Sequence, residues 1–170
     1  MQKGFTLVEL IIVIVLLGIL AVNAVPKFIN ASDDARQKTV EQLMGQIQST
    51  VEINRGYANV KGKAIGDQVV TLDEVGDFSF SDGFPQNKSE ATSPNLYFFE
   101  LMNISQSVRT VVENSDTQRL ISYGDLASYE TNTVSRIGYG TDDLTDGNCY
   151  AEYRLNALNV PEYDIELTGC

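Results

Sequence analysis

The chain of 170 residues contains no histidine and no tryptophan, and it has only two cysteines. Without histidine, the usual pairs of nucleophile and base cannot be assembled. Two cysteines also supply too few soft ligands for a typical zinc site. No glycine-rich loop of the kind that cradles phosphates occurs in the sequence. We therefore expect neither an enzyme nor a bound cofactor or metal.

Basic residues are also few in this chain. The chain has 12 Lys and Arg against 23 Asp and Glu, which gives a net charge of −11. Residues 65–170 hold five basic and eighteen acidic residues, whereas residues 1–64 hold seven and five. Nucleic-acid binding needs clustered Lys and Arg, so no nucleic-acid partner is expected. The acidic C-terminal part should be soluble, and its copies should repel one another unless salt screens them.

Charge is almost absent from residues 5–25, where Glu9 is the one ionisable side chain. This run of 21 residues is close to the roughly 20 that cross a bilayer as a helix. A carboxylate in such a span costs about 2.5–3.5 kcal/mol on insertion scales, so its presence indicates a use. Three interpretations are an ordinary membrane anchor, a buried core helix, and a signal peptide that is cleaved after Ala24 to release a secreted binding module.

The N-terminal motif Gly4-Phe5-Thr6-Leu7-Val8-Glu9, followed by the apolar run, favours a fourth interpretation. It closely resembles the class III leader and N-terminal helix of type IV pilins. The resemblance implies that the prepilin peptidase cleaves after Gly4 and that the new amine of Phe5 is methylated. It further implies a precursor in the inner membrane with a cytoplasmic leader. Pilus assembly machinery then adds the subunit to a helical homo-polymer on the bacterial surface.

The same resemblance assigns roles to three residues of the helix. Glu9 can neutralise the amine of Phe5, either its own or that of a neighbouring subunit, and pilins favour the intermolecular pairing. Gly18 and Pro26 bracket a segment of weak helix propensity. In similar pilins this segment melts on assembly, so we expect the same of residues 18–26. A simple kink at Pro26 is the alternative.

Beyond Pro26 the sequence predicts an amphipathic helix. Apolar residues recur at helical spacing and polar residues fill the other face. The predicted stripe consists of Ala31, Ala35, Val40, Leu43, Ile47, Val51, Asn54 and Ala58. A continuous helix from Phe5 to Ala58 would be about 80 Å long. Its first half has no partner within the subunit, which is the physical argument for a polymer.

Residues 61–170 are expected to form a β-rich head. Strands are predicted at residues 69–72, 78–80, 134–139, 150–155 and 163–167, with a turn at Asp82-Gly83 and a weak helical pattern over residues 96–112. The last three strands would form an antiparallel meander that packs on the helix. The fold class is thus α+β, a long helix packed on a small antiparallel sheet. It divides into a leader at 1–4, a membrane and assembly helix at 5–27, an amphipathic helix at 28–60 and a head at 61–170.

Cys149 and Cys170 are expected to form a disulfide in an oxidising compartment, with two free thiols as the alternative. The segments Gly147-Asn148-Cys149-Tyr150 and Leu167-Thr168-Gly169-Cys170 resemble the mannose-sensitive haemagglutinin branch of type IV pilins, as does Ala24-Val25-Pro26-Lys27-Phe28-Ile29-Asn30. The acidic stretch from Asp142 to Asn148 is interpreted as an ordinary turn, with a calcium loop as the alternative.

The predicted function is a structural pilus subunit, a major rather than a minor pilin, that attaches cells to surfaces. A type II secretion pseudopilin or a minor pilin is the nearest alternative, because these proteins share the N-terminal motif.

Overall fold

The computed structural model describes residues 6–73, 75–91, 95–102, 104, 110–115 and 117–170, excluding the side chains at 23–26, 28 and 29. The chain forms two compact units, Met1–Arg36 and Gln37–Cys170. Helix α1, Leu7–Val60, contributes to both of them. Each unit is described by itself below.

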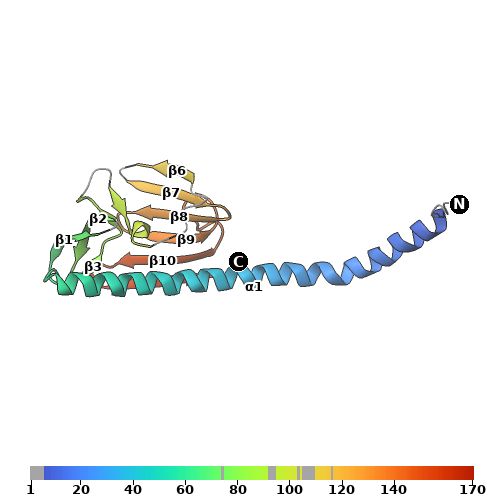
Figure 1. Ribbon diagram of the computed structural model, residues 1–170, viewed down its shortest axis with the longest axis horizontal. Helices are drawn as coiled ribbons and strands as arrows, with labels where there is room; N and C mark the ends of the chain where they lie inside the picture. Colours follow the sequence, from blue (N-terminus) through green and yellow to red (C-terminus); the bar gives the residue numbers. More distant parts are fainter. Residues whose placement is uncertain (1–5, 74, 92–94, 103, 105–109, 116) are drawn as a thin grey trace. The chain divides into compact units, whose positions relative to one another are not determined.

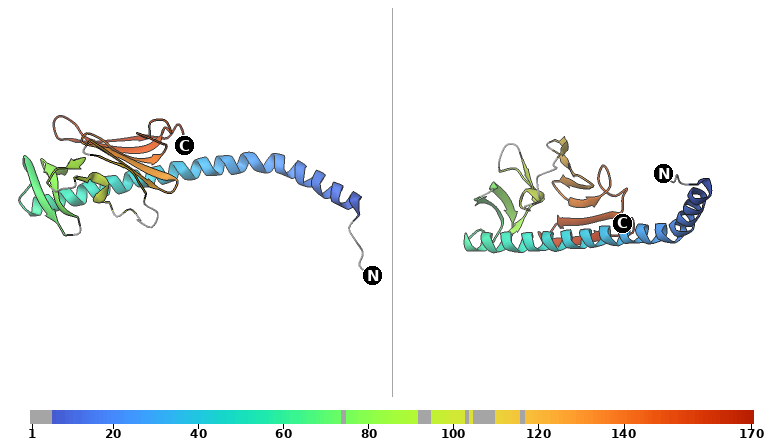
Figure 2. Two further views of the ribbon diagram at one scale, coloured as in Figure 1. Left: turned by 90° about the horizontal axis from the view of Figure 1, so that it is seen from above. Right: turned by 45° about the vertical axis from the view of Figure 1, so that its right-hand side comes forward.

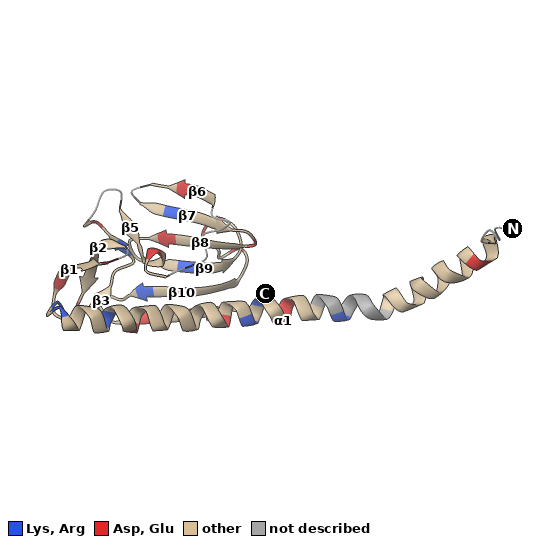
Figure 3. Cartoon of the chain, in the orientation of Figure 1, with Lys and Arg blue, Asp and Glu red and all other residues tan. Residues whose placement is uncertain are grey.

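In the first unit, α1 is helical through both Gly18 and Pro26. Every large apolar side chain between residues 7 and 22 is exposed. Figure 3 shows this stretch of α1 without charged residues after the acidic one near its start. Within the described residues, no helical stretch combines the length and the hydropathy that are needed to span a membrane.

The second unit contains a six-stranded antiparallel sheet in which each strand pairs with its neighbours in sequence, in the order β11-β10-β9-β8-β7-β6 (Figure 1). Its strands are β6 Thr110–Asn114, β7 Gln118–Tyr123, β8 Leu126–Thr131, β9 Ser135–Tyr139, β10 Cys149–Leu155 and β11 Pro161–Glu166. The predicted meander of the last three strands is confirmed. At the edge, all five residues of β6 are exposed, and its register with β7 shifts between Val111 and Glu113.

Shorter strands lie between α1 and the six-stranded sheet in the sequence. They are β1 Asp67–Leu72, β2 Gly76–Ser81 and β3 Phe84–Pro85 in one sheet, β4 Lys88–Ser89 and β5 Leu96–Tyr97 in another, and the 3₁₀ turn η1 Phe98–Glu100. The predicted turn between β2 and β3 is confirmed, with Asp82 and Gly83 at φ of 48° and 82°. The helical pattern expected over residues 96–112 is wrong for the described residues, which form β5, η1 and the start of β6.

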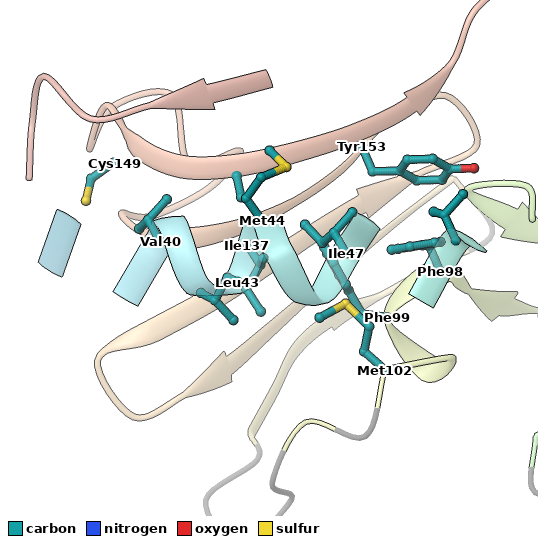
Figure 4. Packing of buried hydrophobic residues seen from close by; sticks show 12 residues of the cluster. Val40, Leu43, Met44, Ile47, Phe98, Phe99, Met102, Ile137, Cys149 and Tyr153 are labelled. Atoms are coloured by element: carbon teal, nitrogen blue, oxygen red, sulfur yellow. The ribbon is translucent and has the colours of Figure 1, made fainter. Parts of the chain in front are cut away.

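Helix α1 packs on one face of the six-stranded sheet with a buried apolar stripe (Figures 1 and 2). Of the predicted stripe, Val40, Leu43, Ile47, Val51 and Ala58 are buried and Met44 joins them, whereas Ala31 and Ala35 are exposed because no described strand covers the helix there. Figure 4 shows Val40, Leu43, Met44 and Ile47 facing a second group that comes from the sheet and from the segment at η1. That group consists of Phe98, Phe99, Met102, Ile137, Cys149, Ala151 and Tyr153. Full burial stabilises the fold by about 1.5–3 kcal/mol for each large apolar side chain.

The short strands are tied to the large sheet by buried hydrogen bonds. Tyr153 Oη donates to the carbonyl of Pro85 at 2.5 Å. Asn87 Nδ2 lies 2.9 Å from both the carbonyl oxygen of Tyr153 and Ser135 Oγ. Burial raises the pKa of Tyr153, so this hydroxyl stays protonated and remains a donor.

A buried ion pair joins β7 and β8 on the helix side of the sheet. Arg119 Nη2 lies 2.7 Å from Glu130 Oε2, and the second oxygen of Glu130 accepts the backbone N–H of Phe99 at 2.7 Å. Glu100 also pairs with the guanidinium. Burial alone would lower the pKa of Arg119, but the carboxylates of Glu130 and Glu100 outweigh it and raise this pKa. Arg119 therefore stays charged inside the head.

The first prediction concerns the helix stripe. Replacing the fully buried Ile47 by alanine should lower the free energy of unfolding by about 2–5 kcal/mol, because a cavity forms in the core. The matched change Ile53→Ala, at a side chain 71 % exposed on the same helix, should cost less than about 0.5 kcal/mol. Denaturant unfolding of the purified chain measures both, and equal losses would contradict the packing described.

The second prediction concerns the buried pair. Glu130→Gln should lower the free energy of unfolding by about 3–5 kcal/mol, because Arg119 loses a fully buried counter-charge. The double variant R119M/E130L should lose much less than the single variants R119M and E130L do in sum, because both members of the buried pair are then removed and only Glu100, whose side chain is 24 % exposed, loses a partner. Additive losses in a double-mutant cycle would show that the two residues do not act as a pair.

Candidate assembly site

Glu9 lies in the first turn of α1 and caps its N-terminus together with Thr6. Glu9 Oε2 accepts hydrogen bonds from the backbone N–H of Thr6 at 2.9 Å and from Thr6 Oγ1 at 2.8 Å. In return, the backbone N–H of Glu9 donates to Thr6 Oγ1 at 3.3 Å. This reciprocal arrangement is a capping box, in which each side chain satisfies a backbone donor of the first turn.

The capping box is a role for Glu9 that our sequence reasoning missed. The signal was present, because Thr6-Leu7-Val8-Glu9 has the Thr-x-x-Glu spacing of the motif. The predicted processing residues Gly4 and Phe5 lie outside the described residues. The pairing of Glu9 with an amine at Phe5 therefore stays a prediction.

The apolar surface that follows Glu9 surrounds the helix. Exposed side chains at consecutive positions such as Ile11, Ile12, Val13 and Ile14 point in all directions around the axis, so no single stripe is formed. No atom from beyond the helix backbone lies within 4 Å of the Cβ position at Gly18. Such a surface carries no chemistry of its own. It can bind lipid or the apolar surface of other protein chains.

The predicted disulfide is present and closes the C-terminal end of the sheet. Cys149 starts β10 and Cys170 follows β11, with their Cα atoms 4.9 Å apart. Between them the backbone approaches itself closely, and the N–H of Gly169 donates to the carbonyl of Asn148 at 2.8 Å. A Cβ at Gly169 would lie 1.8 Å from the carbonyl oxygen of Gly147, so only glycine fits at position 169.

The acidic loop between β9 and β10 is held by its own threonines. Asp146 accepts hydrogen bonds from the Oγ1 and backbone N–H of Thr141, at 2.7 and 3.0 Å. Asp143 accepts from the Oγ1 and N–H of Thr145, at 2.6 and 3.1 Å. These bonds, the threonine hydroxyls first, lower the pKa of both carboxyls. Across the described part of the chain, no group of three or more acidic or cysteine side chains is arranged to hold a metal ion.

These features define a class of protein: an α+β head on one half of a helix whose other half is an exposed apolar surface. The family model "Prokaryotic N-terminal methylation motif" matches residues 1–22. The type IV narrow pilus major component PilA5 of Thermus thermophilus is 40 % identical over 93 residues, which are 55 % of this chain and 78 % of that protein. The chain belongs to the type IV pilin family.

More distant matches cover less of the molecule. Type IV major fimbrial proteins FimA of Dichelobacter nodosus are 40 % identical over 52 residues, which are 31 % of this chain and about a third of each FimA. No solved structure matches this chain.

Proposed function

We propose that this chain is a structural subunit of a type IV pilus, assembled through its N-terminal helix into a surface filament that attaches cells to surfaces. The observation that carries the proposal is the exposed apolar surface of residues 7–22, at the start of a chain with an N-terminal methylation motif. Each of these side chains is worth about 1.5–3 kcal/mol when it is fully buried. Polymerisation buries them outside the membrane.

The proposed route begins in the inner membrane. The precursor holds residues 5–27 in the bilayer, with the leader at 1–4 in the cytoplasm. The prepilin peptidase cleaves after Gly4, and the new amine of Phe5 is methylated. Assembly machinery then moves the subunit from lipid into the filament, where copies of the same helix take the place of lipid.

Glu9 sets the position of each new subunit in this proposal. Its carboxylate is held at the backbone N–H of Thr6, one residue beyond the amine that cleavage creates. In the filament it exchanges this cap for the amine of a neighbouring copy. A charge left unmatched in a low-dielectric core is strongly penalised, so only one axial position of the incoming subunit satisfies both groups.

Residues 18–26 act as the adaptable part of the helix. They are helical here, and we propose that they unwind on assembly, because Gly18 has low helix propensity and Pro26 lacks a backbone donor. Extension of this segment would let the head and the apolar helix find their contacts independently.

We further propose that the chain is a major pilin of the mannose-sensitive haemagglutinin branch. The relatives are a narrow pilus major component and major fimbrial proteins, which favours a major subunit. The sequence around the disulfide carries the branch assignment. A type II secretion pseudopilin or a minor pilin remains the alternative of the same family.

The proposal is tested by mass spectrometry of the N-terminal peptide in material sheared from intact cells. We expect a peptide that begins with N-methylated Phe5, which establishes a processed surface pilin. The same terminus found only in the inner membrane would indicate a pseudopilin or a minor subunit. A soluble product that begins at Val25 would overturn the filament in favour of a secreted binding module.

Glu9 has two separable properties, and two variants distinguish them. Glu9→Ala removes both the negative charge and the cap, whereas Glu9→Gln removes the charge and keeps an acceptor for Thr6. If Glu9 pairs with an amine, both variants should insert in the membrane normally and lose most filament yield in shearing assays. Normal yield of Glu9→Gln would mean that capping alone is required.

A further inference from the structure

One end of the head exposes three large apolar side chains beside two lysines. Val60 and Ile65 flank the turn between α1 and β1, and Leu158 lies in the turn between β10 and β11. Ile65 is 82 % exposed. Figure 3 shows basic residues at this end of α1. We name the group formed by Val60, Lys61, Lys63, Ile65 and Leu158 the Ile65 surface.

Asp82 ties the two turns of the Ile65 surface together. Its carboxylate accepts a hydrogen bond from the backbone N–H of Gly66 at 2.8 Å and another from Asn159 Nδ2 at 2.9 Å. Gly66 follows Ile65, and Asn159 follows Leu158, so one carboxylate holds together the two turns that carry these apolar side chains. A surface that is ordered in advance loses little conformational freedom when it binds.

The lysines of this surface differ from the arginines of the head. Three arginines are ion-paired with glutamates of the head: Arg119, Arg136 and Arg154. Lys61 instead lies over the ring of Tyr57, and Lys63 donates to Gln68 Oε1 at 3.2 Å. Neither lysine has a carboxylate at ion-pair distance among the described residues, so both charges are available to a partner.

A hollow of about 260 Å³ near the turn between β7 and β8 has complementary properties. Its lining includes the apolar side chains Val112, Leu120, Leu126 and Ala127 and the acidic Asp125 and Asp142, and no Lys or Arg. We name these six residues the Asp125 groove. Its volume is below the roughly 300–1,000 Å³ of small-molecule pockets, so it suits protruding side chains better than a ligand. Neither aspartate forms an ion pair with a described residue.

We infer that the Ile65 surface of one copy of this chain docks into the Asp125 groove of a second copy. Apolar side chains then meet apolar side chains, and Lys61 and Lys63 face Asp125 and Asp142. The inference rests on the proposed function, which brings many copies into a regular array. Opposite charge across the contact also offsets the repulsion between acidic heads.

The two surfaces lie at opposite ends of the strands. In an antiparallel meander, the turns β7–β8 and β9–β10 fall at one end of the strands and the turn β10–β11 at the other end. A contact between two different surfaces is heterologous, and it repeats in one direction when the rotation does not close a ring. This is the type of contact that a filament uses.

Charge changes test the contact in filaments of the full chain. K61E/K63E and D125K/D142N should each lower the yield of sheared filaments roughly two- to five-fold at low ionic strength. Asn is used at position 142 because that residue has φ of 46°, which Asn tolerates. Combining all four changes should restore the yield. The control for D125K/D142N is the variant D73K/D164N, which makes the same change in net charge at two other exposed aspartates and should keep wild-type yield.

Cysteine pairs test the same contact without relying on charge. Ile65→Cys combined with Val112→Cys should give disulfide-linked ladders from oxidised filaments, whereas Ile53→Cys combined with Val112→Cys should not. All three positions are exposed. Wild-type filaments with unaffected charge variants and no ladder would overturn the docking and leave the proposed function standing. A wild-type chain that forms no filament would overturn both.

Discussion

The poor solvation of apolar side chains by water governs both halves of α1. In the second half, the apolar residues form one stripe, and the sheet covers it from Val40 to Val51. In the first half, they surround the helix, so no single sheet face could cover them. The head therefore folds as a unit with its own core, while the apolar segment still has surface to bury. The membrane-held precursor and the packed filament that we propose are two ways of removing the same surface from water.

Charge shapes the head by a different route. The sheet face toward the helix is not purely apolar, because Arg119 and Glu130 lie there and satisfy each other together with the N–H of Phe99. Breaking such a pair is costly, and its geometry specifies how β7 and β8 align. Most other carboxylates lie at the surface, where repulsion between copies grows with crowding and falls with salt. A filament of such heads needs contacts that are either apolar or matched in charge.

The sequence predicted those parts of the fold that follow a simple hydrophobic period. The helix stripe at Val40, Leu43, Ile47 and Val51 and the three C-terminal strands were readable in this way, and the Asp-Gly dipeptide at 82–83 signalled its turn. Strands β7 and β8 were missed. Their buried positions hold the polar residues Arg119, Ser128 and Glu130, so the sequence does not show the alternation of apolar and polar residues that marks a strand. The segment after Leu96 was misjudged because its apolar residues serve a short strand and one 3₁₀ turn. At the candidate site, the role of Glu9 as a cap was encoded in Thr6-x-x-Glu9. The tie from Asp82 to Asn159 joins residues far apart in sequence, and no local pattern signals it.

The irregular edge strand β6 has a consequence for chains that are held at high local concentration. A straight edge strand offers a row of free N–H and C=O groups on which another copy can pair, and such pairing leads to amyloid-like aggregation. In β6 the register shift between Val111 and Glu113 interrupts that row, and the charge of Glu113 opposes stacking of identical strands. At this edge of the sheet, crowded heads are thereby less able to pair strand to strand, which leaves association there to side-chain surfaces.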